Sequence, residues 1–496
     1  MSLFRKKDLT AMLAQAEDGG KGLKRTLGAG NLIALGVGAI IGAGLFVRTA
    51  AAAGQAAGPA VTISFIVAAI GCAFAGLCYA EFAAMIPISG SAYAYSYVTM
   101  GETVAWIIGW ALIMEYALGA ATVSIAWSEY LNKLLGHTIP YEWSHSPFES
   151  ITDTAGVVHH GIMNAPALLI LLLLTLLLIK GTQESAIVNA IIVFIKVAIV
   201  LLFIFIGWKF INPANHTPYM IPADQAPVVD ASGKVIADYS GVFKHGWGGV
   251  LGGAAIVFFA FIGFDAVSTA AQEAKNPKRD MPIGILGSLV VCTILYILFG
   301  HVLTGVANWK DFVDPLKGRE ASVAYAISTY MTGYGWLATA VTVAILAGFS
   351  SVILVMLMGQ SRVFFSMAND GLLPKVFSDL HPKYRTPYKS NWILFIFVGA
   401  FAAFVPGSVA GDLTSFGTLF AFVLVSAGVW ILRKKSPEME RPFKTPLVPV
   451  VPILGAIICL GMIVALDAQT LKVAFTWMAI GLVVYFVYSR KHSKLN

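Results

Sequence analysis

"GVGAIIGAGLF" (residues 36–46) places four glycines, Gly36, Gly38, Gly42 and Gly44, within a run that is otherwise apolar. The run has the hydropathy of a membrane-spanning helix, although each glycine disfavours a helix by roughly 1 kcal/mol relative to alanine. Such a cluster favours either a close helix–helix contact of the GxxxG type or a helix interrupted within the membrane. It is not a dinucleotide-binding fingerprint, because the spacing is GxGxxxG and no strand precedes it.

The composition of the whole chain places this run in a membrane protein. Of the 496 residues, 58% are hydrophobic and 12% are charged, whereas an average soluble domain has about 25% charged residues. A spanning helix needs roughly 20 mostly apolar residues. We therefore predict an all-α membrane protein with twelve transmembrane helices. The twelve apolar runs are 29–55, 59–86, 102–131, 166–180, 185–208, 248–274, 283–306, 335–361, 392–406, 413–432, 446–466 and 470–488.

The basic residues indicate how the chain is oriented. Arg5, Lys6 and Lys7 are followed by a polar stretch rather than an apolar one, so no cleavable signal is expected. If all twelve runs cross the bilayer, most of the 33 Lys and Arg residues lie on the same side as the N-terminus. We expect both termini to be cytoplasmic in a multi-pass protein of the cell membrane. The net charge of +7 then reflects orientation and requires no nucleic acid partner.

The sixth apolar run contains a second interruption. Its sequence "GGAAIVFFAFIGFDAV" (residues 252–267) has Gly263 near the centre and a carboxylate, Asp265, two residues later. The first and sixth runs hold corresponding places in two sets of five runs. Interruptions at corresponding places are typical of transporters built from inverted repeats. This coincidence favours two broken helices over a simple packing contact.

A broken helix exposes backbone groups that need a ligand. Unpaired N–H and C=O groups are tolerated at membrane depth only where they line a cavity or are buried in protein. Free N–H groups at the start of a half-helix attract a carboxylate, and freed carbonyls attract an ammonium group. An amino acid zwitterion carries both charges, so these residues predict an amino acid site.

These motifs resemble the amino acid, polyamine and organocation transporter superfamily, and within it the cationic amino acid transporter family. "GAIIGAGLF" (38–46) is similar to the first-helix signature, and "FAFIGFDAVSTAAQEAKNPKRDMPIGI" (259–285) to the sixth-helix signature with the following cytoplasmic loop. The resemblance extends over helices 1 to 10 through "YAEFAAMIPISGSAYAYSYVTMGE" (79–102), "GWALIMEYALG" (109–119) and "GQSRVFFSMANDGLLP" (359–374).

The resemblance implies a LeuT-like fold of five plus five inverted repeats, in which a bundle of helices 1, 2, 6 and 7 moves against a scaffold. The expected organisation has five parts. They are a cytoplasmic tail (1–28), a first repeat of helices 1 to 5 (29–210), an extracellular loop (211–247), a second repeat of helices 6 to 10 (248–433), and helices 11 and 12 with a cytoplasmic C-terminus (434–496).

The resemblance also implies a substrate site at the two breaks. The substrate carboxylate is expected to meet backbone N–H groups of the first break, and its amino group to meet carbonyls of both breaks. The N–H groups are those of Gly42, Ala43 and Gly44, and the carbonyls are those of Ile40, Phe259 and Ile262. Phe259 is also the expected aromatic gate over the substrate. Four further residues are expected to line the site: Ile41, Glu115, Gly119 and Ala260.

Three ionisable residues within the apolar runs are candidates for proton coupling, because a charge in the membrane costs several kcal/mol. The resemblance implies that Lys196 replaces the cation of sodium-coupled relatives and contacts carbonyls of helix 1 together with Ser350 or Ser351. Lys196 either loses its proton during transport or is a permanently charged structural contact. Glu115 is a proton site, a partner for a substrate amine or basic side chain, or a protonated structural acid. Asp265 either caps the second half of helix 6 or takes part in coupling.

The sequence thus predicts a secondary transporter that imports L-amino acids by proton symport and alternating access. A sodium-independent exchanger or uniporter is the alternative. Apart from Glu115, the expected lining is small or apolar, which favours small neutral amino acids such as alanine and leaves cationic ones as a second possibility. The chain has no HExxH motif, nucleophile elbow or P-loop. We therefore expect no enzyme, metal or cofactor, and a substrate-sensing receptor is the remaining class.

Overall fold

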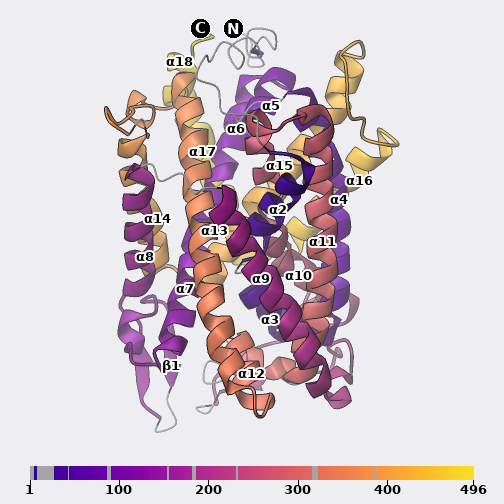
Figure 1. The fold of residues 1–496 in the computed structure, drawn as a ribbon, viewed down its shortest axis with the longest axis vertical. Coiled ribbons are helices and arrows are strands. Elements are labelled where there is room, and N and C mark those ends of the chain that lie inside the picture. The colour runs from indigo at the N-terminus through magenta and orange to yellow at the C-terminus, as the bar shows by residue number, and fades with distance from the viewer. Residues whose placement is uncertain are drawn as a thin grey trace.

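The computed structural model describes residues 5–7, 27–42, 44–86, 91–152, 156–180, 186–230, 233–314, 322–384 and 386–495. These residues form a bundle of mostly upright helices, with β1 and α12 at the end opposite the C-terminus (Figure 1). The prediction of an all-helical membrane protein is confirmed.

The structure contains seventeen described α-helices and two short hairpins, and the long helices follow the apolar runs. The α-helices are α2 (Ala29–Ile40), α3 (Thr49–Ala52), α4 (Val61–Met85), α5 (Ser91–Thr99), α6 (Glu102–Leu112), α7 (Gly119–Leu134), α8 (Ala165–Lys180), α9 (Ala186–Gly207), α10 (Gly246–Val257), α11 (Pro277–Val306), α12 (Ser322–Tyr330), α13 (Gly335–Asn369), α14 (Tyr388–Phe404), α15 (Gly407–Lys435), α16 (Val450–Val464), α17 (Ala468–Val484) and α18 (Arg490–His492). Two antiparallel hairpins pair β1 (Ser150–Thr152) with β2 (Val158–His160) and β3 (Val228–Val229) with β4 (Val235–Ala237).

Each of the twelve apolar runs falls on a helix. Among the described residues, eight helical stretches are long and apolar enough to cross a membrane. They are Gly44–Met85, Glu102–Leu134, Ile191–Phe210, Gly246–Ser268, Pro277–Val306, Gly335–Asn369, Gly407–Lys435 and Ala468–His492. α2, α8, α14 and α16 are shorter apolar helices. The count of twelve spans stays a prediction.

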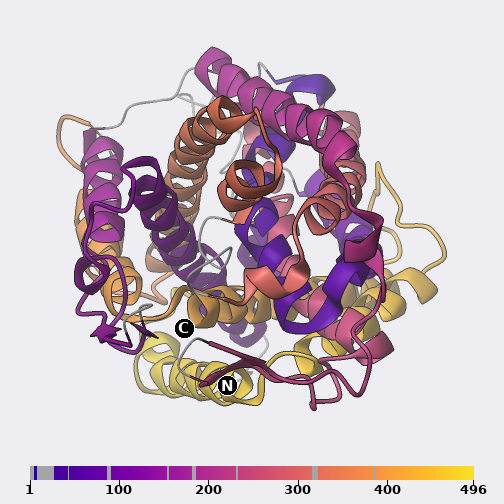
Figure 2. The same ribbon diagram turned by 90° about the horizontal axis from the view of Figure 1, so that it is seen from below.

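The interrupted helices lie inside the bundle. The most apolar window of Gly246–Ser268 is 89% buried, compared with 28% for that of Ala468–His492. Viewed along the long axis, the indigo first helix lies within a ring of other helices, and the yellow C-terminal helices lie at the rim (Figure 2). α11 packs along both α2 and α4, and α13 packs along α7 and α9. This arrangement encloses the region between the two breaks.

The first and last described segments of the chain meet at one end of the bundle. Lys7 forms an ion pair with Asp370, at the end of α13, with an N–O distance of 2.6 Å. Arg5 donates to the carbonyl of Leu495 at 2.6 Å, and the N–H of Lys494 donates to the carbonyl of Asp370 at 3.1 Å. Both described ends therefore lie on one side, at the top of Figure 1.

The four cysteines lie in helices and are all inaccessible. Cys72, Cys78, Cys292 and Cys459 are free thiols with 0% exposure. They behave as small apolar core residues.

Candidate functional site

The first helix is interrupted where the glycine cluster predicts. α2 ends at Ile40, Ile41 is extended with φ −74° and ψ 104°, and a π-helix begins at Gly44 (Gly44–Arg48). The carbonyl of Gly42 accepts the N–H groups of Leu45 at 3.1 Å and Phe46 at 3.3 Å. None of the hydrogen bonds among the described residues uses the N–H of Gly42 or Gly44. Ala43, the third predicted donor, lies outside the described residues.

The sixth helix is interrupted at the predicted residues as well. α10 continues as a 3-10 turn (Phe258–Phe261), Ile262 is extended with ψ 133°, and a 3-10 helix begins at Asp265 (Asp265–Glu273). Gly263 has φ +114°, a conformation that side chains other than glycine rarely adopt. A Cβ atom on Gly263 would also lie 2.9 Å from the carbonyl oxygen of Ala39, in the first helix.

The two breaks are in direct contact. A Cβ atom on Gly44 would overlap the backbone of Ala260. Tyr296, on α11, places its hydroxyl 3.0 Å from the carbonyl oxygen of Ile40 and 2.8 Å from that of Ala260. One hydroxyl proton is thus shared between two carbonyls freed by the breaks. Sequence reasoning missed Tyr296, and its only signal is a phenol inside an apolar run.

Most predicted lining residues gather at this contact. Ile40, Ile41, Phe259, Ala260 and Ile262 are all buried in or beside the breaks. The carbonyl of Phe259 accepts the N–H of Ile262 at 3.3 Å, whereas that of Ile262 accepts no hydrogen bond among the described residues.

Gly119 contacts other helices than the broken ones. A Cβ atom on Gly119 would lie 2.9 Å from the Met356 sulfur of α13 and 3.4 Å from a methyl group of Thr414 in α15. Gly119 therefore lies where α7, α13 and α15 approach one another closely.

Three of the four phenylalanines at the sixth-helix break pack against neighbouring helices. The ring of Phe258 lies 5.6 Å from Phe422, that of Phe264 lies 4.9 Å from Phe422, and that of Phe261 lies 5.3 Å from Tyr296. Phe259 differs, because the guanidinium carbon of Arg48 lies 5.9 Å from its ring centroid.

Arg48 is a second feature that sequence reasoning missed as a site residue. Its side chain is 5% exposed and pairs with Asp412 of α15, which is 19% exposed. The sequence signal is an arginine in a membrane span, but its partner lies 364 residues away.

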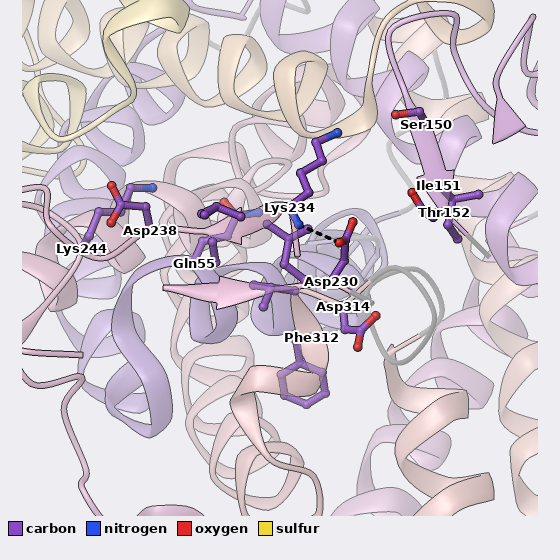
Figure 3. Close-up of a pocket in the computed structure, with 14 residues that line it drawn as sticks. Gln55, Ser150, Ile151, Thr152, Asp230, Lys234, Asp238, Lys244, Phe312 and Asp314 are labelled. Carbon is purple, nitrogen blue, oxygen red and sulfur yellow. Dashed lines mark hydrogen bonds between the residues drawn. The ribbon is translucent and has the colours of Figure 1, made fainter. Parts of the chain in front are cut away.

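Two cavities lie at the end of the molecule that carries β1. The larger, of about 400 Å³, is lined by loop residues that include Asp230 and Lys234, whose N–H donates to Asp230 at 2.9 Å (Figure 3). The smaller, of about 250 Å³, is lined in part by Asp412. Gln55 and Lys244 line both cavities. Neither cavity lies between the breaks, which are closely packed in this conformation.

Lys196 connects three helices beside the first break. Its ammonium donates to the carbonyl of Gly38 at 2.9 Å, which is the contact with helix 1 that the resemblance implies. A Cβ atom on Gly348 of α13 would lie 2.8 Å from Cε of Lys196, so the lysine stem crosses α13 at a glycine. Ser350 donates to the carbonyl of Leu346 in its own helix, and Ser351 is buried one residue further on.

Glu115 and Asp265 form a buried acidic pair. Glu115 lies on a π-helical segment (Ile113–Leu118) of the third span, and neither of its oxygens has a hydrogen-bond partner among the described residues. One oxygen of Asp265 accepts the hydroxyl of Tyr116 at 2.6 Å, and the other has no partner there. The two carboxyl groups are electrostatic neighbours. Both side chains are fully buried, with 0% exposure.

The comparisons with known proteins agree with a transporter. The amino acid permease family model matches residues 27–488. The chain is 44% identical over 497 residues to the branched-chain amino acid permease BcaP of Bacillus subtilis, covering 100% of this chain and 99% of that protein. It is 41% identical over 498 residues to the methylthioribose transporter of Bacillus subtilis, with the same shares covered.

Similarity to cationic amino acid transporters is more distant. The chain is 33% identical over 440 residues to the vacuolar cationic amino acid transporter 4 of Arabidopsis thaliana, covering 88% of this chain and 68% of that one. These relatives are permeases and transporters rather than enzymes. The chain therefore belongs to the amino acid permease family of the amino acid, polyamine and organocation transporter superfamily.

Proposed function

We propose that the protein imports neutral L-amino acids across the cell membrane by alternating access, with the substrate bound between the two helix breaks. The observation that carries this proposal is the juxtaposition of opposite backbone groups at the breaks. Gly42 and Gly44 supply N–H groups that take part in none of the hydrogen bonds among the described residues, and Ile262 supplies a carbonyl of the same kind. A carboxylate and an ammonium group on one carbon atom match these two sets.

The neutral substrate class follows from the side chains around the breaks. Ile41, Phe259 and Ile262 are apolar, and the ring of Phe259 lies below the Arg48 cation. The bacterial relative named as a branched-chain permease also favours an aliphatic substrate over a cationic one. The name of the methylthioribose transporter makes that sugar a compound to include in the test.

Proton coupling is the proposed energy source. Lys196 places an ammonium group against a carbonyl of helix 1, so its protonation would be sensitive to movement of that helix. Glu115 and Asp265 offer a second proton site at the sixth-helix break, and Ser350 and Ser351 lie on α13 close to the Gly348 that Lys196 crosses. Exchange without proton coupling is the alternative mechanism within the same architecture.

The proposed architecture has twelve spans, a five-plus-five inverted repeat and cytoplasmic termini. Support comes from the meeting of both ends at one end of the bundle and from the charge bias of the loops. The charged cavity near β1 would then face outside.

The test is uptake of radiolabelled alanine and leucine into proteoliposomes with an alkaline interior. We expect accumulation that depends on the pH gradient and that unlabelled branched-chain amino acids inhibit. Uptake only when the vesicles contain unlabelled amino acid would support exchange. Absence of amino acid flux in both modes, or flux of methylthioribose alone, would overturn the proposal.

A further inference from the structure

The guanidinium group of Arg48 lies between an aromatic ring and a carboxylate, one helical turn beyond the first break. Its carbon lies 5.9 Å from the ring centroid of Phe259, and Nη2 donates to Asp412. Nε has no hydrogen-bond partner among the described residues. Gly411 leaves room for the group, since a Cβ atom there would lie 3.1 Å from Nη1.

An aromatic face and a carboxylate are the groups with which proteins bind ammonium and guanidinium ligands. Here one of them, Phe259, belongs to the break that would hold the amino acid backbone. The other, Asp412, lines the cavity of about 250 Å³ beyond it. A basic substrate side chain that extends from the break toward that cavity would meet both groups, but Arg48 already occupies the position.

We propose that Arg48 fills a subsite for basic side chains with a cation of the protein itself, so that the transporter rejects lysine and arginine. This inference rests on the proposed function, because it explains the substrate range of the same site. The charge of Asp412 is neutralised by Arg48, and a second cation brought beside Arg48 would be repelled in a partly desolvated site. A neutral side chain meets no such repulsion.

Removal of Arg48 should therefore create a binding site for a cation and not only an empty cavity. Asp412 is 19% exposed and lines a cavity, so without its partner its carboxylate is accessible to a substrate ammonium. Replacement of Asp412 alone is less informative, because it leaves Arg48 buried without a counter-ion.

The experiment measures inhibition of labelled leucine uptake by lysine in proteoliposomes. In the wild type, lysine should inhibit at least tenfold more weakly than unlabelled leucine. With Arg48→Met, half-inhibition should need at least tenfold less lysine than in the wild type, and labelled lysine should enter the vesicles. With Arg48→Met combined with Asp412→Asn this gain should disappear, and Arg48→Lys should still exclude lysine.

Lys244→Met is the matched control, because Lys244 lines the same cavity as Asp412 but does not pair with it. If Lys244→Met gained as much lysine transport as Arg48→Met, the proposal would be overturned, because loss of any positive charge near the cavity would then explain the gain. It is also overturned if lysine inhibits the wild type as well as leucine does, if the double variant keeps the gain, or if Arg48→Met transports leucine but ignores lysine. Arg48→Gln gives the same comparison where the methionine variant does not fold.

Failure of the proposed function gives a different result. In that case the wild type takes up no amino acid, whereas failure of this inference alone leaves leucine uptake by the wild type intact.

Discussion

Single side chains hold the two breaks in place. Tyr296 bridges the carbonyls of Ile40 and Ala260, and Lys196 holds the carbonyl of Gly38. Each bond joins a neighbouring helix to backbone that helix geometry does not satisfy. At membrane depth water cannot substitute for these partners, so loss of one donor leaves an unpaired carbonyl.

Tyr296→Phe should destabilise the protein by about 1–3 kcal/mol, the usual cost of a buried acceptor left without its donor. The ring contacts with Phe65 and Phe261 are kept, so the variant isolates the hydroxyl. Thermal unfolding in detergent measures the change. Tyr384→Phe, at an exposed loop position, is the control and should unfold like the wild type; equal unfolding of both variants would contradict the assigned role of Tyr296.

Lys196→Met should abolish amino acid accumulation driven by a pH gradient while counterflow exchange persists. The reason is that methionine keeps much of the stem volume but has no proton to release. Gradient-driven uptake and counterflow are compared in the same proteoliposomes. Lys209→Met, near the end of the same span and exposed, should accumulate substrate normally, and accumulation by Lys196→Met would contradict its role in coupling.

At the scale of helices, the two broken elements form one unit. They touch at Gly44 and Ala260 and again at Gly263 and Ala39. A parallel bridge pairs Leu27 with Ala274, and the N–H of Lys275 donates to the carbonyl of Leu27 at 2.8 Å. Because backbone contacts join them at two levels, we expect the first and sixth helices to move together.

Gly44→Ala should reduce leucine uptake at least tenfold and lower stability by about 1–3 kcal/mol, the range for overpacking. The added methyl group meets the backbone of Ala260, which cannot rotate away as a flexible side chain can. Gly461→Ala on α16 is the matched control, since nothing lies within 4 Å of a Cβ atom there. Uptake and thermal unfolding are measured for both; wild-type behaviour of Gly44→Ala would contradict the close contact of the breaks.

The sequence predicts both interruptions, because each leaves a local signal, and the resemblance to the transporter superfamily implies the helix-1 contact of Lys196. Glycine clusters and a lysine stand out in apolar runs, and the spacing of the runs aligns the two breaks. Arg48 stands out in the same way, but the partners of Tyr296 and Arg48 leave no such signal. Their partners are 36 to 364 residues away, and only packing of the helices specifies which side chain reaches which carbonyl or carboxylate. Gly119 was expected to line the substrate site, but its nearest contacts in the structure are with α13 and α15.

At the scale of the whole molecule, the two ends of the bundle differ in chemistry. One end carries both described ends of the chain, and the other carries β1 and α12 (Figure 1). The contact of Lys7 with Asp370 lies at the first end, and the charged cavity, lined in part by Thr152 of β1, lies at the second. In the proposed orientation the first end is cytoplasmic, as the bias of basic residues predicts.

An epitope inserted after Val242, which is 75% exposed, should bind antibody on intact cells. The same epitope after the exposed Glu438 should bind only after the cells are permeabilised. Both insertions lie in loops, so neither disturbs a helix. Reversed accessibility of the two sites would contradict the proposed orientation.

Because all four cysteines are buried, the native thiols are inaccessible to labelling reagents in water. A maleimide that cannot cross lipid should leave the native chain unmodified, because Cys72, Cys78, Cys292 and Cys459 have 0% exposure. Paramagnetic or fluorescent reporters can therefore be attached at single new thiols in an otherwise native sequence. Changes in spacing between the moving and stationary helices can then be followed through the transport cycle.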